Sequence, residues 1–178
     1  MRYKEEIIKA MEQLGKHPKT IFIGQAVALP GHAISGTLEK VPQEKKIELP
    51  VFEEVQSGIA TGLALEGFIP ISCFPRFDFF ILSLNQIVNH LDKIRVMSKD
   101  DFKPRVIIRV GIGSRVPINA GPQHTQNHTE AMRSMLTEID VVELVEPEQI
   151  ETVYNIALYR PDSKSTLIIE HIEYYTSK

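Results

Sequence analysis

The segment from Glu48 to Phe80, ELPVFEEVQSGIATGLALEGFIPISCFPRFDFF, constrains the fold more than any other part of the chain. A short strand over 46–49 is closed by a proline, and Glu53 follows where a carboxylate suits the positive end of a helix dipole. Gly67 ends that helix, and the apolar run 69–74 predicts a buried strand. The order strand, helix, strand predicts a parallel βαβ unit. A loop crowded with phenylalanine follows at the carboxyl edge of the sheet, where open α/β sheets bind ligands.

The rest of the chain repeats this alternation of helices and strands. The further expected helices, placed mainly by apolar residues at helical spacing, span 3–15, 78–97, 128–136 and 147–159. The further expected strands, placed by short β-branched or apolar runs, span 20–23, 106–110, 141–145 and 167–170. We therefore expect a single α/β domain over 1–178, a three-layer α/β/α fold with a mostly parallel central sheet. Residues 111–127 are expected to form a long loop, which in a compact domain is usually functional or mobile.

Composition and charge exclude several classes of protein. With 43% hydrophobic and 24% charged residues, the chain has the composition of a packed globular domain rather than a disordered one. The net charge is −3 and there is no basic stripe, so we expect no nucleic-acid partner. The single cysteine, Cys73, leaves no internal disulfide and fits a reducing compartment. No apolar run approaches the roughly 20 residues that span a bilayer, and the amphipathic N-terminus does not resemble a signal peptide. We therefore expect a cytoplasmic protein without a membrane partner.

Several motifs occur in the order and at the spacing of one known family. They are LPVFEE, the glycines Gly58, Gly62 and Gly67, the FDFF loop, NQIVNHLDKI at 85–94, QHTQNHTEA at 123–131 and IDVVELVEPEQIETVYNIAL. From residue 20 to residue 170 the chain resembles the pyrimidine-binding domain of thiamine-diphosphate enzymes. Within that family it is most similar to transketolases and to the β subunits of 2-oxoacid dehydrogenase decarboxylase components. The fold implied by this resemblance agrees with the one expected from the alternation of elements.

The resemblance implies a site for the aminopyrimidine ring of thiamine diphosphate. Glu53 matches the glutamate that hydrogen-bonds this ring in the family and promotes its imino tautomer, so Glu53 is the expected catalytic acid. Phe79 matches the aromatic residue that stacks on the ring, Phe77 is a candidate for the same wall, and Val51 matches an apolar position of the pocket. His124 matches a histidine near the reactive carbon of the cofactor, where it handles protons or orients the acyl intermediate.

Without the resemblance, these residues have simpler interpretations. Glu53 is then an ordinary acidic residue of a first helical turn, the two phenylalanines belong to the core, and His124 is a loop histidine. His124 and His128 have the i, i+4 spacing of metal ligands, but no third ligand has a recognisable spacing. We therefore expect no metal site in this chain.

The sequence departs from the family in two ways. Relatives carry acidic residues after the first strand, where this chain has Gly24-Gln25-Ala26, so an acidic contact near the cofactor or at a subunit boundary is missing. In the family a separate domain with a G-D-G motif holds the diphosphate and its Mg²⁺, and a C-terminal domain follows; this sequence shows neither. A diphosphate needs a metal ion and helix N-termini to neutralise it, so we expect a partner chain to supply the diphosphate and Mg²⁺ site.

Two functions remain open from the sequence. The first is the pyrimidine-binding subunit or fragment of a split transketolase-like or 2-oxoacid dehydrogenase or decarboxylase enzyme, which acts on a ketose or a 2-oxo acid. Such a chain is expected in a homodimer or an α2β2-type assembly, with the helix that bears Gly58 and Gly62 and the phenylalanine loop as contact surfaces. The second is a non-catalytic interaction module that keeps the fold. The missing acids favour the module, whereas Glu53, Phe79 and His124 favour catalysis.

Overall fold

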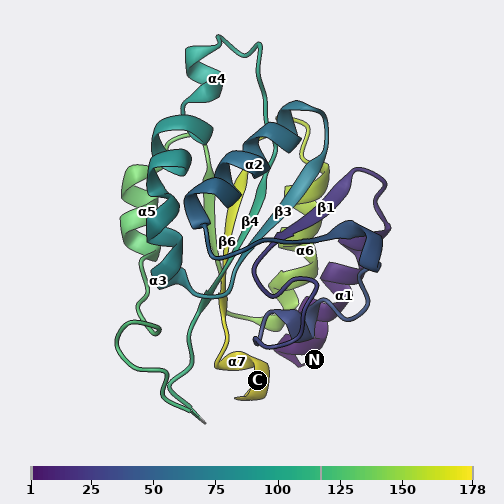
Figure 1. The fold of residues 1–178 in the computed structure, drawn as a ribbon, viewed down its shortest axis with the longest axis vertical. Helices are drawn as coiled ribbons and strands as arrows, with labels where there is room; N and C mark the ends of the chain where they lie inside the picture. Colours follow the sequence, from purple (N-terminus) through teal and green to yellow (C-terminus); the bar gives the residue numbers. More distant parts are fainter. Residues whose placement is uncertain (1, 117, 178) are drawn as a thin grey trace.

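A computed structural model describes residues 2–116 and 118–177, and these form one sheet of six strands between two layers of helices (Figure 1). The strands lie in the order β2-β1-β3-β4-β6-β5, and each neighbouring pair is parallel. In chain order they are β1 (Thr20–Gly24), β2 (Lys46–Glu48), β3 (Ile69–Phe74), β4 (Ile107–Ile112), β5 (Asp140–Leu144) and β6 (Thr166–His171). The expected α/β/α fold is confirmed, and its sheet is parallel throughout the described residues.

Helices cover both faces of the sheet (Figure 1). The α-helices are α1 (Tyr3–Lys16), α2 (Glu53–Leu65), α3 (Phe77–Phe80), α4 (Ile94–Met97), α5 (Thr129–Met135), α6 (Pro147–Tyr159) and α7 (Tyr174–Ser177). Short 3₁₀ turns span Ser35–Thr37, Gln43–Lys45 and Ile81–Ser83, and a π-helix spans Asn85–Leu91. Helices α1 and α6 pack on each other and cover one face, whereas α2, α3 and α5 cover the other. None of these helices is long and apolar enough to cross a membrane.

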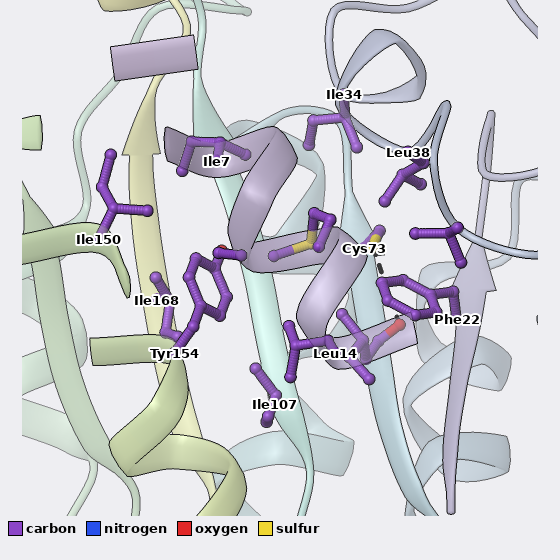
Figure 2. Close-up of a cluster of buried hydrophobic side chains, with 14 of the residues drawn as sticks. Ile7, Leu14, Phe22, Ile34, Leu38, Cys73, Ile107, Ile150, Tyr154 and Ile168 are labelled. Atoms are coloured by element: carbon purple, nitrogen blue, oxygen red, sulfur yellow. Dashed lines mark hydrogen bonds between the residues drawn. The ribbon is translucent and has the colours of Figure 1, made fainter. Parts of the chain in front are cut away.

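The side chains of the central strands alternate between the two helix layers. On β4, Ile107 belongs to the core under α1 and α6, and Ile108 belongs to the core under α2 and α3. Figure 2 shows the first of these cores, to which Leu14 of α1, Tyr154 of α6 and Cys73 of β3 contribute. Burial on both faces explains why the central strands read as nearly continuous apolar runs, as is typical of parallel sheets.

The prediction of one helix over 78–97 is wrong, because the structure divides this segment into several short pieces. Helix α3 begins at Phe77, with Arg76 at the N-cap position. The chain then passes through a 3₁₀ turn and the π-helix before it reaches α4. At the end of the π-helix the Asp92 N–H donates to the carbonyl of Ile87, five residues back, at 2.9 Å. The apolar spacing located a helical segment correctly, but it carries no information about the hydrogen-bond register.

Asp92 ties this helical segment to the turn before β5. Its buried carboxylate accepts hydrogen bonds from the backbone N–H groups of Thr137, Glu138 and Ile139 at 2.8–3.2 Å, and from the Lys93 ammonium at 2.7 Å. Burial alone raises the pKa of this carboxyl, but Lys93 and the backbone donors outweigh burial, so the pKa lies below its ordinary value. The resulting stabilisation is fully present above the unfolded-state pKa of about 3.9, and it is lost as the pH falls through the folded-state pKa.

Replacing Asp92 with asparagine is expected to lower the free energy of unfolding at neutral pH by about 2–3 kcal/mol, because the backbone donors lose a charged acceptor. The difference from wild type should shrink below about pH 4, because the unfolded wild-type chain then takes up a proton at Asp92 more readily than the folded chain does. Urea unfolding at neutral pH and at about pH 3 measures both values. Asp101→Asn, at an exposed aspartate, is the control and should change stability by less than about 0.5 kcal/mol. An Asp92→Asn effect of equal size at both pH values would contradict this account.

Candidate functional site at the carboxyl edge of the sheet

A pocket of about 470 Å³ opens at the carboxyl edge of the sheet, beyond the ends of β1 and β3. The polar and aromatic residues that line it, which define the site pocket, are Gln25, His32, Glu48, Arg76, Phe79 and His124. They come from the loop after β1, the end of β2, the loop and helix after β3, and the long loop after β4. The pocket therefore lies at the edge where the sequence predicted a ligand site.

Two residues shape the loop that follows β1. Gly24 has a φ of +143°, and a Cβ there would lie 2.3 Å from the carbonyl oxygen of Cys73, so the turn out of the sheet requires glycine. The carboxylate of Glu48 accepts the backbone N–H groups of residues 26–29 at 2.6–3.3 Å. These donors hold the loop in one arrangement beside the site pocket. Sequence analysis missed Glu48, whose position at the carboxyl end of a strand was the one available signal.

Glu53 begins α2 next to the site pocket. Its side chain is 5% exposed, and its Oε1 accepts a hydrogen bond from the amide of Gln25 at 3.2 Å. Gln25 lines the pocket, whereas Glu53 stands one hydrogen bond behind it in this chain. The adjacent Glu54 is exposed and accepts long hydrogen bonds from Asn85 and Gln86, at 3.4 and 3.5 Å. The two neighbouring glutamates thus have different surroundings, and Glu53 is the one linked to the site pocket.

Phe79 and His124 meet in the site pocket. Their ring centroids lie 5.3 Å apart with an interplanar angle of 83°, which is an edge-to-face contact. Both side chains are half-buried, so each retains surface that a ligand can contact. The structure therefore brings together an aromatic face and an imidazole that the sequence had placed in different segments of the chain.

The other two residues predicted to bind the cofactor lie outside the lining of the site pocket. Phe77 is fully buried and packs against Phe80 and His128, with ring centroids 6.0 and 5.4 Å away. It therefore supports α3 from the core. Val51 is 69% exposed on the segment before α2. Its surface is available to another chain rather than to the site pocket of this one.

The long loop 111–127 has a defined course where it approaches the site. A Cβ at Gly113 would lie only 1.7 Å from the carbonyl oxygen of His124, so two parts of the loop touch through their backbones. The amide of Gln126 donates to the carboxylate of Asp78 at 2.8 Å and ties the loop to α3. The described part of this loop therefore holds His124 at the site pocket, and the functional role of the loop stays a prediction.

Gly113→Ala is expected to displace His124, because the added Cβ and the His124 carbonyl oxygen cannot occupy their present positions together. The ring resonances of His124 in an NMR spectrum should shift as its contact with Phe79 is lost. Gly62→Ala is the control: nothing lies within 4 Å of its Cβ, and the substitution should stabilise α2 by at most about 1 kcal/mol. Unchanged His124 resonances in a folded Gly113→Ala variant would show that this contact does not set the position of the histidine.

Besides Glu48, two further titratable residues of the site pocket could not be predicted from the sequence. His32 lies in the loop after β1, and burial together with the charge of Arg76 lowers its pKa to about 4. Arg76 is half-buried; burial lowers the pKa of its guanidinium, and the charge of Asp78 acts in the opposite direction. Neither residue belongs to a recognised motif. Their positions in the loops after β1 and β3 were the only sequence signal.

The site pocket fits the aminopyrimidine end of thiamine diphosphate. Phe79 and His124 offer an aromatic face and an imidazole at the wall of the pocket, and the carboxyl of Glu53 lies one hydrogen bond behind Gln25. Within residues 2–116 and 118–177, no group of three or more His, Cys, Asp or Glu side chains could hold a metal ion. The lining of the site pocket therefore suits an aromatic ring such as the aminopyrimidine.

Two curated relatives indicate the kind of protein to which the chain is similar. It is 28% identical over 120 residues to 2-oxoisovalerate dehydrogenase subunit beta of Bacillus subtilis, which covers 65% of this chain and 37% of that protein. It is 26% identical over 187 aligned positions to pyruvate dehydrogenase E1 component subunit beta of Cyanidium caldarium, which covers 100% of this chain and 54% of that protein. The chain thus spans about half, or less, of the length of these relatives.

A solved structure and a family model complete the comparison. A split-gene transketolase, described as an inactive beta4 tetramer, aligns with a TM-score of 0.63 at 18% identity, over 96% of this chain and 51% of that one. This likeness shows a shared fold. The family model for the pyrimidine-binding domain of transketolase matches residues 1–177. The chain therefore belongs to the transketolase pyrimidine-binding domain family of thiamine-diphosphate-dependent enzymes.

Proposed function

We propose that this chain is the pyrimidine-binding part of a split thiamine-diphosphate enzyme and forms the active site together with a partner chain that holds the diphosphate and Mg²⁺. The observation that carries the proposal is the position of Glu53 at the start of α2, where Gln25 links its carboxyl to the site pocket. The reaction is the transfer of a two-carbon unit from a ketose or the decarboxylation of a 2-oxo acid. Similarity to two dehydrogenase β subunits supports the second of these reactions.

Each of the three site residues has a role that suits its surroundings. When bound, thiamine diphosphate supplies a nucleophilic carbon for attack on the carbonyl group of the substrate. The nearly buried carboxyl of Glu53, which Gln25 links to the site pocket, forms the hydrogen bond to the aminopyrimidine ring. The exposed face of Phe79 stacks on that ring and fixes its orientation. His124, whose ring contacts Phe79 in the site pocket, exchanges protons with the substrate.

An exposed apolar surface on α2 supports the requirement for a partner chain. Val51, Phe52, Val55 and Ile59, which we call the α2 patch, are 69, 62, 53 and 38% exposed. The last three of these residues line one groove of about 280 Å³. Clustered apolar side chains of this kind mark surfaces that contact other proteins. We propose that the partner chain covers the α2 patch.

Mixing the chain with a partner that carries the diphosphate site tests the proposal. In calorimetric titrations with thiamine diphosphate and Mg²⁺, the pair should bind at least about 100-fold more tightly than the lone chain, because only the pair neutralises the diphosphate. Val55→Asp should prevent pairing, since it places an unpaired carboxylate in an apolar contact. Leu65→Asp is the matched control, at a 44% exposed leucine of α2 outside the patch. Tight cofactor binding by the lone chain would refute the partner requirement, and pairing by Val55→Asp would refute the role of the patch.

A non-catalytic module is the second candidate, and the presence of Gln25 favours it. Gln25 stands in the segment where relatives carry acidic residues. A pair that binds the cofactor but turns over no ketose or 2-oxo acid would support the module. The assembly as a homodimer or an α2β2 complex and the cytoplasmic location stay predictions.

A further inference from the structure

We propose that Arg76 and His32 form an oxyanion-binding subsite in the site pocket, which takes the carboxylate or phosphate group of the substrate. The identification of the bound oxyanion as part of a substrate rests on the proposed function. The binding of an oxyanion by these two residues follows from the surroundings of their own side chains.

Arg76 is a partly buried cation without a counterion. Its Nη1 is buried and has no hydrogen-bond partner, and the described residues provide no carboxylate within ion-pair distance of the guanidinium. This nitrogen lies against the loop, 3.4 Å from the Cβ position of Gly113, while the rest of the half-buried side chain lines the site pocket. A partly desolvated charge without an ion-pair partner is unfavourable, so an anion in the pocket that contacts the accessible part of the guanidinium would stabilise it.

Each of the acidic side chains around Arg76 accepts at least one hydrogen bond from another group. The Glu48 carboxylate accepts four backbone N–H groups, whose dipoles offset its charge. Asp78 Oδ1 accepts the hydrogen bond from Gln126, Asp78 Oδ2 is buried without a hydrogen-bond partner, and the charge of Asp78 acts on Arg76 from beyond ion-pair distance. Glu53 accepts its hydrogen bond from Gln25. None of these three carboxylates forms an ion pair with Arg76, so its guanidinium can pair with an anionic ligand.

His32 adds a neutral donor beside this charge. Its Nδ1 accepts the backbone N–H of Ile34 at 3.4 Å, which leaves the imidazole proton on Nε2. Burial and the charge of Arg76 keep the pKa of His32 at about 4, so the ring is neutral near pH 7. The planar guanidinium fork matches two oxygens of a carboxylate or phosphate, and a neighbouring N–H group can serve a further lone pair. Together the two side chains provide one charge and one neutral donor for an oxyanion.

An NMR titration of the full chain tests the subsite with two separate probes. Pyruvate serves as the carboxylate probe and inorganic phosphate as the phosphate probe, and the resonances of the Arg76 side chain and the His32 ring are followed. At least one probe should give saturable shifts of both residues. The bound anion should also raise the pKa of His32, because it offsets the charge of Arg76. Binding of pyruvate alone assigns the subsite to a 2-oxo acid, and binding of phosphate alone assigns it to a sugar phosphate.

Matched variants distinguish binding of the probe at the subsite from a general effect of the net charge of the protein on its affinity. Arg76→Gln should weaken binding of the probe at least tenfold. Arg76→Lys, which keeps the charge but loses the fork, should cause a smaller loss. Arg115→Gln removes the same charge from an exposed position outside the site pocket and should leave the affinity within about twofold of wild type.

Two results would overturn the subsite: no saturable shift with either probe, or an equal loss of affinity in Arg76→Gln and Arg115→Gln. The test of oxyanion binding can fail or succeed independently of the test of the proposed catalytic function. Glu53→Gln should leave oxyanion binding by the lone chain unchanged, whatever it does to the activity of the pair. Oxyanion binding in a chain whose pair has no activity would refute catalysis and keep the subsite.

Discussion

Glu53→Gln in the chain assembled with its partner is expected to lower kcat by about 10²–10⁴-fold, the range that a positioned acid or base contributes. Glutamine preserves the size of the side chain and retains an oxygen that can accept the hydrogen bond from Gln25. It removes the ability to take up and release a proton at the aminopyrimidine ring. Affinity for thiamine diphosphate should fall much less, because the stacking surface of Phe79 is unchanged. Steady-state kinetics and calorimetric titration of the pair measure the two quantities separately.

Glu54→Gln is the matched control for this experiment. It removes the same charge from the same helical turn, but Glu54 is exposed and accepts only the two long hydrogen bonds from Asn85 and Gln86. Its kcat should stay within about twofold of wild type, as expected for an exposed surface carboxylate. A Glu53→Gln pair with undiminished turnover would refute the assigned acid. Equal losses in both variants would attribute the effect to the charge at the start of α2 and not to a proton transfer.

The architecture could be predicted because its information is local. Short apolar runs located β3 and β4, and glycine or proline residues marked where elements end or begin, as Pro147 does at the start of α6. The segment 78–97 could not be resolved in this way. The carboxylate of Asp92, at the end of the π-helix, contacts the backbone of residues 137–139, and a contact so distant in sequence leaves no periodic signal.

The residues of the candidate site also fall into two groups, those that a local motif revealed and those that only the fold brings together. Phe79 and His124 were found because they belong to short motifs, and the structure places both in the site pocket. Phe77 lies only two residues from Phe79 on a helix of four residues, and packing against Phe80 turns it into the core. Arg76 and His32 belong to no motif. Their juxtaposition arises from the parallel order of β1 and β3, which brings the following loops to one edge.

Arg109 is another residue whose surroundings the sequence did not reveal. It interrupts the apolar run of β4, yet its side chain is fully buried. Its guanidinium donates to both oxygens of the Glu170 carboxylate at 2.7 and 2.8 Å and to the hydroxyl of Thr37 at 3.0 Å. The hydroxyls of Tyr154 and Tyr175 also donate to Glu170. Burial, followed by the charge of Glu170, raises the pKa of both phenols well above the ordinary value, so they remain donors across the working pH range.

Arg109→Met is expected to lower the free energy of unfolding by about 3–5 kcal/mol, because it leaves the buried Glu170 carboxylate without its cationic partner. Urea unfolding monitored by circular dichroism measures the change. Arg133→Met is the control, since Arg133 and Glu130 form an exposed ion pair, and it should cost less than about 1 kcal/mol. A cost of similar size in both variants would mean that the buried pair contributes no more than a surface pair.

The double variant Arg109→Met/Glu170→Leu distinguishes loss of a favourable pair from the burial of a lone charge. If the cost of Arg109→Met arises from the unpaired carboxylate, removing that carboxylate should restore a large part of the stability. Restoration should be incomplete, because the hydroxyls of Tyr154 and Tyr175 then lose their acceptor inside the core. A double variant less stable than Arg109→Met would instead show that the tyrosine–glutamate hydrogen bonds, and not the ion pair, hold this part of the core together.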